Sequence, residues 1–183
     1  MFQNVNTLER TTCQDAPEGF QLARGSAFQT WSEATLESYY SDLVQAMDEE
    51  KNLMTLKYAR MDKLIPTLNI SPLIDEIVKI EVLWQEELSE KYPHVVILGQ
   101  TSGYCGAEES TSHITFDIYL RCELETYSQH TLESYYQDVS KALKEKSNLQ
   151  ERKYAYLVES MGYSSLEKVE EKIMNRDESR SQL

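Results

Sequence analysis

The residues best suited to chemistry lie in a hexapeptide, TLESYY, that occurs twice, 96 positions apart. In both copies a glutamate precedes a tyrosine by three residues, as Glu37 does Tyr40 and Glu133 does Tyr136. Residues at this spacing share one flank of a helix, and both types can exchange protons with a substrate. If the protein is an enzyme, we expect the catalytic residues to be Glu37, Tyr40, Glu133 and Tyr136.

Further charged residues could bind a substrate beside these pairs. Arg24 and Arg121 offer a fixed fork of donors for a carboxylate or a phosphate. Lys57 and Lys153 are 96 positions apart, like the two hexapeptides. The expected substrate-binding residues are Arg24, Trp31, Lys57, Arg121, Glu123 and Lys153. In an alternative that stays open, these charges form internal ion pairs that hold the helices in register.

Other chemistries lack their motifs. No Glu-x-x-His pair occurs, so we expect no metal site. Phosphate-binding and dinucleotide-binding motifs are missing, so we expect no cofactor. Cys13 precedes a predicted helix, where a thiol can be acidified, but no motif links a histidine to it. With Cys105 and Cys122 it makes an odd count without a Cys-x-x-Cys spacing, which predicts reduced thiols and no disulfide.

The composition limits the possible partners. The formal net charge of −13 argues against nucleic acid, which requires clustered lysines and arginines, and against an anionic membrane. No apolar run approaches the roughly 18 residues of a membrane span, and the first residues do not resemble a signal peptide. We therefore expect a cytoplasmic protein that binds neither nucleic acid nor membranes.

Two copies of one helical unit are predicted to position these residues. With the chain aligned to itself at an offset of 96, identities extend from Phe20 and Phe116 to Ala59 and Ala155. Such similarity indicates an internal duplication. Apolar residues recur at helical spacing around each hexapeptide. In the first copy this stripe consists of Leu36, Tyr39, Tyr40, Leu43 and Met47.

The helix starts can be predicted from capping residues. Ser32 and Ser128 are expected to cap the helices of the hexapeptides, and Asn52 and Asn148 the helices that follow. The short segments between these helices predict tight turns and antiparallel pairs. Residues 94–113 contain three of the six glycines and are expected to form the longest loop.

A long central helix is predicted over residues 73–91, with Pro72 at its start and Pro93 beyond its end. Glu81 interrupts its apolar stripe. Because burying a lone carboxylate is costly, we expect Glu81 to be buried against an arginine, a lysine or a tyrosine.

We predict an all-α fold in which two tandem three-helix repeats, joined by the central helix, are related by a pseudo-twofold axis. The chain is expected to be a single domain. Its expected parts are repeat one at 12–62, the central helix at 73–91 and repeat two at 112–174, within a domain of residues 1–183.

Several longer motifs resemble a known family. They read CQD, ARGSAF, LESYYSDL and KYARM in the first half, then WQEELSEKYP, YLRCELETYS and TLESY. Together they resemble the bacterial domain of unknown function family 4125 over nearly the whole chain. The resemblance implies an all-helical domain and no established activity. The chain departs from the family before Cys13, where it reads LERTTC and the family has Gly-Gly-Arg.

Two functional hypotheses follow from these residues. In the first, a small soluble helical protein binds a small polar or anionic metabolite in a pocket at the repeat interface, and whether it also transforms the metabolite is left open. In the second, a non-catalytic adaptor docks a protein partner on its helical surface. A pocket favours the first hypothesis, and an exposed apolar patch favours the second.

Overall fold

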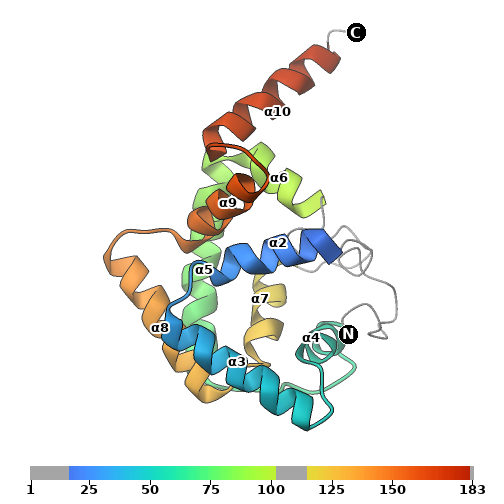
Figure 1. The fold of residues 1–183 in the computed structure, drawn as a ribbon, viewed down its shortest axis with the longest axis vertical. Coiled ribbons are helices and arrows are strands. Elements are labelled where there is room, and N and C mark those ends of the chain that lie inside the picture. The colour runs from blue at the N-terminus through green and yellow to red at the C-terminus, as the bar shows by residue number, and fades with distance from the viewer. Residues whose placement is uncertain (1–16, 102–114, 182–183) are drawn as a thin grey trace.

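The computed structural model describes residues 17–101 and 115–181, and the regular elements in these ranges are all α-helices (Figure 1). The helices are α2 (Pro17–Phe28), α3 (Glu33–Asp48), α4 (Leu53–Met61), α5 (Pro72–Lys91), α6 (Pro93–Thr101), α7 (Phe116–Leu124), α8 (Gln129–Lys144), α9 (Leu149–Ser160) and α10 (Leu166–Ser181). The predicted all-α class is confirmed over these ranges. No helix in them combines the length and the apolar character that a membrane crossing needs.

The helices start at the predicted caps. The hydroxyls of Ser32 and Ser128 each accept a hydrogen bond from the backbone amide three residues further on, in α3 and α8. The side-chain oxygens of Asn52 and Asn148 do the same for α4 and α9. Each cap satisfies an otherwise unpaired amide and stabilises its helix by about 1 kcal/mol.

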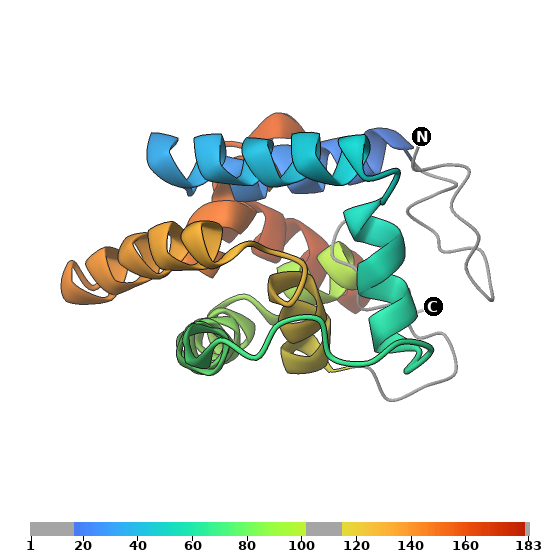
Figure 2. The same cartoon turned by 90° about the horizontal axis from the view of Figure 1, so that it is seen from below.

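The turns after α3 and α8 share one backbone geometry. Glu50 and Lys146 each have a φ of 55°, and the next amide in each turn donates to the carbonyl of Ala46 or Ala142. A left-handed residue at this place ends a helix. The chain then leaves at an angle, so α4 turns away from α3 instead of folding back along it (Figures 1 and 2). The predicted antiparallel pairing of α3 with α4 is therefore wrong.

Helices of the first half pair instead with helices of the second. The helix α3 packs against α8, α2 against α9, and α4 against α7; Figure 2 shows α3 lying alongside α8. Reciprocal hydrogen bonds join α3 to α8. The amide of Ser32 donates to Asp138 at 2.9 Å, and the amide of Ser128 donates to Asp42 at 3.0 Å. Contacts between the two halves therefore hold the fold together.

The central helix α5 packs against helices of the second half of the chain. It starts at Pro72, one residue before the predicted 73, and ends at Lys91 as predicted. It packs against α7, α8 and α9. Its Ile77 and Trp84 are buried in the main core together with Leu132 of α8. The hydrophobic face of α8 is thus closed by α5.

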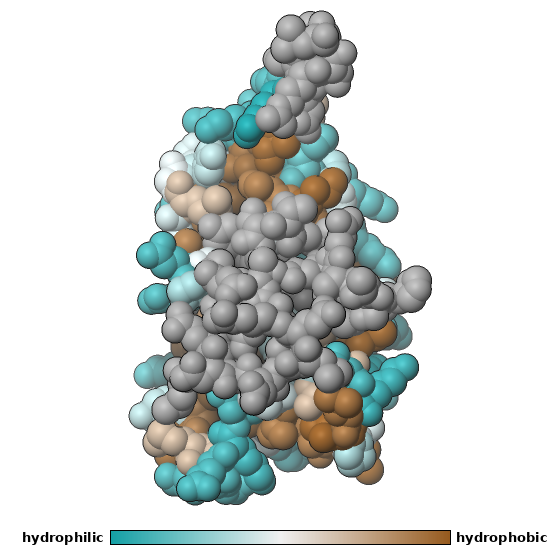
Figure 3. Space-filling view, turned by 90° about the vertical axis from the view of Figure 1, so that its right-hand side faces the viewer, coloured by the Kyte–Doolittle hydropathy of each residue, from teal (hydrophilic) through white to brown (hydrophobic). Residues whose placement is uncertain are grey.

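A smaller core lies where α6, α9 and α10 meet. The predicted loop over 94–113 is wrong for its first part, because residues up to Thr101 belong to α6. Val95 and Val96 are buried in this core, and tertiary packing here overrides the preference of β-branched residues for strands. A Cβ on Gly99 would lie 2.9 Å from the ring of Tyr154, so this contact requires glycine. Hydrophobic residues also reach the surface around α6 and α10 (Figure 3).

The predicted apolar stripe of α3 is only partly buried. Tyr39 belongs to the main core. The remaining members, Leu36, Tyr40, Leu43 and Met47, are exposed, and we call them the α3 apolar face. The helix instead turns Thr35 and Ser38 inward, because their hydroxyls hydrogen-bond to residues of α8. Polar contacts with α8, rather than the apolar stripe, therefore set the inward side of α3.

Candidate functional site

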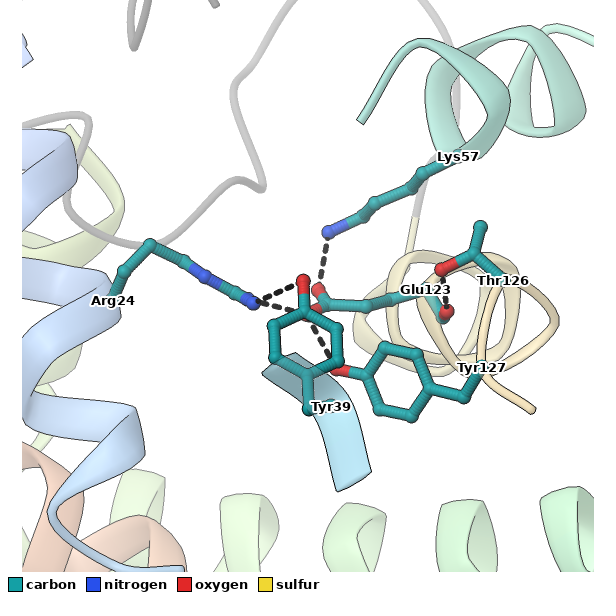
Figure 4. Close-up of polar contacts among 6 residues, drawn as sticks. All are labelled: Arg24, Tyr39, Lys57, Glu123, Thr126 and Tyr127. Atoms are coloured by element: carbon teal, nitrogen blue, oxygen red, sulfur yellow. Dashed lines mark hydrogen bonds and ion pairs between the residues drawn. The ribbon is translucent and has the colours of Figure 1, made fainter. Parts of the chain in front are cut away.

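Glu123, near the end of α7, gathers donors from two other helices and the following turn. Arg24 of α2 makes an ion pair with one of its oxygens, and Lys57 of α4 donates to the other at 2.6 Å. Tyr127, one helical turn further along, donates at 3.0 Å. Arg24 also donates to Tyr39 of α3 at 3.2 Å. Figure 4 shows these side chains converging on the carboxylate.

The cluster around Glu123 is nearly inaccessible to water. Lys57 and Glu123 are 1% and 8% exposed. Burial alone would raise the pKa of Glu123, but the charges of Arg24 and Lys57 outweigh it and hold the pKa well below its usual range. Burial raises the pKa of Tyr127, so its hydroxyl stays a neutral donor. The cluster is therefore an ionised carboxylate matched by two cations.

A second buried carboxylate, Glu81, comes from α5. It is fully buried and accepts hydrogen bonds from the hydroxyl of Tyr135 at 2.5 Å and from the amide of Gln150 at 2.6 Å. Burial raises its pKa, and the two hydrogen bonds and the charge of Lys153 offset this only in part. The prediction that Glu81 is buried against a tyrosine is confirmed. Carboxylates whose environments push their pKa values apart are typical of acid–base sites.

A cavity of about 90 Å³ borders both carboxylates. Its wall is formed mainly by α2, α7 and α9, and includes Ala23, Ala27, Glu81, Glu123, Gln150 and Lys153. This volume can hold several water molecules or a small ligand. Among the described residues, the carbonyl oxygen of the Gln150 side chain is buried without a hydrogen-bond partner. A group in the cavity that donates to this oxygen would remove its desolvation cost of about 1–3 kcal/mol.

Most of the predicted substrate-binding residues come together at this cavity. Arg24, Trp31, Glu123 and Lys153 line it. Lys57 stands behind Glu123, to which it is bonded. These five residues come from α2, the turn after it, α4, α7 and α9. Their gathering follows from the pairing of α2 with α9 and of α4 with α7.

Arg121 does not join them. It pairs with Asp75 of α5 at 2.7 Å, and the two side chains are 39% and 71% exposed. The reason is helical geometry, since residues two apart point to different sides of a helix. When α7 turns Glu123 inward, Arg121 faces the surface.

The four predicted catalytic residues also stay outside the cavity. None of Glu37, Tyr40, Glu133 and Tyr136 lines it. The first three are exposed, and Tyr136 is half-buried against the main core. The structure therefore does not bring them to Arg24 as proton-transfer groups. In each hexapeptide the first tyrosine, Tyr39 or Tyr135, takes the inward position instead.

The sequence prediction missed residues that hold the two carboxylates. Tyr127 follows Glu123 by four positions, a spacing that places both on one flank, and this signal could have found it. Tyr135 lies within the second hexapeptide, in which the neighbouring Tyr136 was predicted to be catalytic instead. Gln150 had no signal of its own, because its role depends on how α9 packs against α5.

Among the described residues, neither Cys122 nor His94 lines the cavity. Cys122 is buried with a free thiol, and burial raises its pKa, which makes the thiolate scarce. Cys13 and Cys105 lie outside the described residues. His94 makes a 2.6 Å contact with Glu170 at the start of α6. Within the described ranges, no cluster of His, Cys, Asp and Glu could hold a metal ion.

Comparison with known proteins gives one match. A family model described as "Protein of unknown function (DUF4125)" matches residues 1–171, in agreement with the resemblance seen in the motifs. No curated protein and no solved structure matches the chain.

Proposed function

Since the chain belongs to the family described as "Protein of unknown function (DUF4125)", we propose from its geometry that it binds a small carboxylate in the cavity between α2 and α9. The local charge supports an anion. Arg24, Lys57 and Lys153 surround the carboxylates of Glu81 and Glu123, and the raised pKa of Glu81 favours its neutral form. This local excess of positive charge stands within a chain of net charge −13.

The proposal uses a pseudo-twofold relation between residues 20–61 and 116–157, in which each position corresponds to the one 96 later. Two observations support the relation. The pairing of α2 with α9 is the counterpart of the pairing of α7 with α4. The bonds from Ser32 to Asp138 and from Ser128 to Asp42 also correspond.

One observation carries the proposal, namely how the two halves differ at equivalent positions. In the pair of α4 with α7, Lys57 lies 3.2 Å from the centre of the Tyr119 ring and donates to Glu123. The chain itself thus provides a ring and a carboxylate for this lysine. A buried cation needs such partners, because its desolvation is costly.

In the equivalent pair of α9 with α2, the lysine is kept, and alanines stand at the positions equivalent to Tyr119 and Glu123. Lys153 corresponds to Lys57, and Ala23 and Ala27 correspond to the tyrosine and the glutamate. Lys153 is half-buried, lies 6.0 Å from the centre of the Tyr154 ring and acts through its charge on Glu81. All three residues line the cavity. The space left by the two alanines therefore matches a ligand that carries a carboxylate, with or without an apolar ring.

A reaction at this site would use Glu81. Its raised pKa lets it hold a proton at a higher pH than an ordinary glutamate. Its partner Gln150 offers an oxygen without a hydrogen bond among the described residues. In this proposal the carboxylate of the ligand faces Lys153, and Glu81 exchanges a proton with the ligand.

The test measures the melting temperature with small carboxylic acids, each beside its neutral amide. We expect acids to raise the melting temperature of the wild type and amides to have no effect. Ala27→Glu places in α2 the carboxylate that α7 has, so this variant should melt at or above the wild-type temperature and no longer respond to acids. Ala27→Leu fills the same space without charge and should also abolish the response.

Gln21→Glu is the matched control, because it adds the same charge on an exposed position of α2. Its response to acids should equal that of the wild type. Equal shifts with acids and amides, or an undiminished response in Ala27→Glu, would contradict the proposal. Those results would leave the charges as internal ion pairs only.

A further inference from the structure

The α3 apolar face is uncovered, although much of its counterpart in α8 is buried. Leu36 and Leu43 are 37% and 41% exposed, and their equivalents Leu132 and Val139 are fully buried. Tyr40 and Met47 are 67% and 58% exposed. In α8, Leu132 and Val139 are closed by α5, Tyr136 is half-buried, and Leu143 is 50% exposed. The same surface thus occurs twice, and only one copy has its covering helix among the described residues.

The charges on α3 and on its turn up to Glu50 are all negative, and Lys51, the next residue, pairs with Glu49. From residue 33 to residue 50 the chain contains Glu33, Glu37, Asp42, Asp48, Glu49 and Glu50 and no lysine, arginine or histidine. At the equivalent positions α8 and its turn have lysines, because Lys141, Lys144 and Lys146 replace Gln45, Asp48 and Glu50. The two surfaces share their shape and differ in charge.

Helix α5 and the end of α8 carry charges of opposite sign. The covering helix α5 is rich in acids, with six Asp and Glu against two lysines, and the surface below it ends in lysines. Opposite charges around a buried apolar seam favour the correct partner and disfavour like-charged ones. For the acidic α3 surface, the same rule requires a covering helix with basic flanks.

We propose that the α3 apolar face docks a basic amphipathic helix of a partner protein. The apolar side chains of such a helix would lie on Leu36, Tyr40, Leu43 and Met47, a spacing of i, i+4, i+7 and i+11 that suits helix-in-groove recognition. A second copy of this chain is disfavoured, because two α3 helices would bring their acidic flanks together. An anionic membrane is disfavoured for the same reason.

The test uses two synthetic peptides of about 18 residues, or about five helical turns. Both carry leucines at i, i+4, i+7 and i+11; one has lysines on its flanks and the other has glutamates. Fluorescence anisotropy should show saturable binding of the lysine peptide only. Its affinity should fall as salt is raised from about 0.05 M to about 0.5 M, because salt screens the flanking charges.

Variants locate the binding site. Leu43→Glu and Met47→Glu should each weaken binding of the lysine peptide about tenfold or more, because either puts a charge in the apolar contact. The matched control is Leu143→Glu, at the position equivalent to Met47 and 50% exposed on α8; it should bind as the wild type does. The double variant Gln45→Lys, Asp48→Lys gives α3 the lysines of α8 and should shift the preference to the glutamate peptide.

Three results would overturn the proposal. One is equal or absent binding of the two peptides by a wild-type protein whose circular dichroism shows it folded. Another is a dimer in sedimentation equilibrium that Met47→Glu dissociates, since the occupant would then be a second copy. The last is binding to phosphatidylcholine vesicles that Met47→Glu abolishes, since the face would then contact lipid.

Discussion

Replacing Glu123 with glutamine tests the electrostatics of the buried cluster. Glu123→Gln keeps the size of the side chain and removes the carboxylate that pairs with both Arg24 and Lys57. Breaking a buried pair costs about 3–5 kcal/mol, because the remaining charge is left unmatched. Lys57 is 1% exposed and cannot reach water, whereas the side chain of Arg24 is 17% exposed and recovers some hydration. We therefore expect a loss near the lower end, about 3 kcal/mol.

Urea denaturation at pH 7 measures this loss, with two comparisons. Lys57→Met in the Glu123→Gln background should recover most of the stability, since an apolar side chain replaces the stranded charge. Arg121→Met breaks the exposed ion pair with Asp75. An exposed pair contributes only about 0–1 kcal/mol to the free energy of unfolding. If Glu123→Gln lowers the free energy of unfolding much more than Arg121→Met does, burial of the ion pair explains the difference.

The pH dependence of the free energy of unfolding tests the same electrostatics. The folded pKa of Glu123 lies below its ordinary value of 4.5, so the stability it contributes is present above that pH and is lost as the pH falls below it. The difference in free energy of unfolding between the wild type and Glu123→Gln should therefore narrow as the pH drops below about 4.5. A loss under about 1 kcal/mol at pH 7, or a difference that stays constant with pH, would refute the reasoning.

Three further outcomes are expected. Glu81→Gln should raise the melting temperature at pH 7, and this gain should vanish below about pH 4.5. The pKa of Glu81 is raised in the fold, so the stability that its carboxyl group contributes is present at low pH and is lost as the pH rises. A lower melting temperature at pH 7 would contradict this. Gly99→Ala should cost about 1–3 kcal/mol in urea denaturation, since its Cβ would press on the Tyr154 ring; an unchanged midpoint would contradict it. Glu170→Gln should speed proteolysis within α10, because Glu170 accepts the first amides of α6; unchanged cleavage would show that this cap does not hold α10 in place.

Local features of the fold were predictable from the sequence, and the orientation of its helices was not. The four caps and the bounds of the central helix depend on residues close in the chain, so Ser32 or Pro72 could be interpreted directly. Which side of α3 faces inward depends on α8, through bonds such as that from Thr35 to Asp138. The apolar spacing placed Tyr39 and Tyr40 on one stripe, and in the structure Tyr39 is buried while Tyr40 is exposed.

In the site, too, some residues were predictable from the sequence and others depend on long-range packing. The unusual position of Glu81 on an apolar stripe was a sufficient signal, because the cost of burying a charge requires a partner. Arg24, Lys57 and Glu123 were singled out by type, but their mutual pairing arises from contacts across the two halves. The cavity itself depends on Ala27, a residue with no chemical signal, and only the packing of α2 on α9 gives it a role.

The central claim is that the space beside Lys153 takes a carboxylate, and the side-chain nitrogen of that lysine reports it directly. Acetate carries the atoms by which a glutamate exceeds an alanine, so it is the minimal probe for the position of Ala27. In protein with ¹⁵N-labelled lysines, we predict that acetate shifts the Nζ resonance of Lys153 saturably and acetamide does not. The resonance of Lys91, which pairs with Glu151 on the surface, should stay unchanged. No saturable shift at Lys153, or an equal shift with acetamide, would contradict the account.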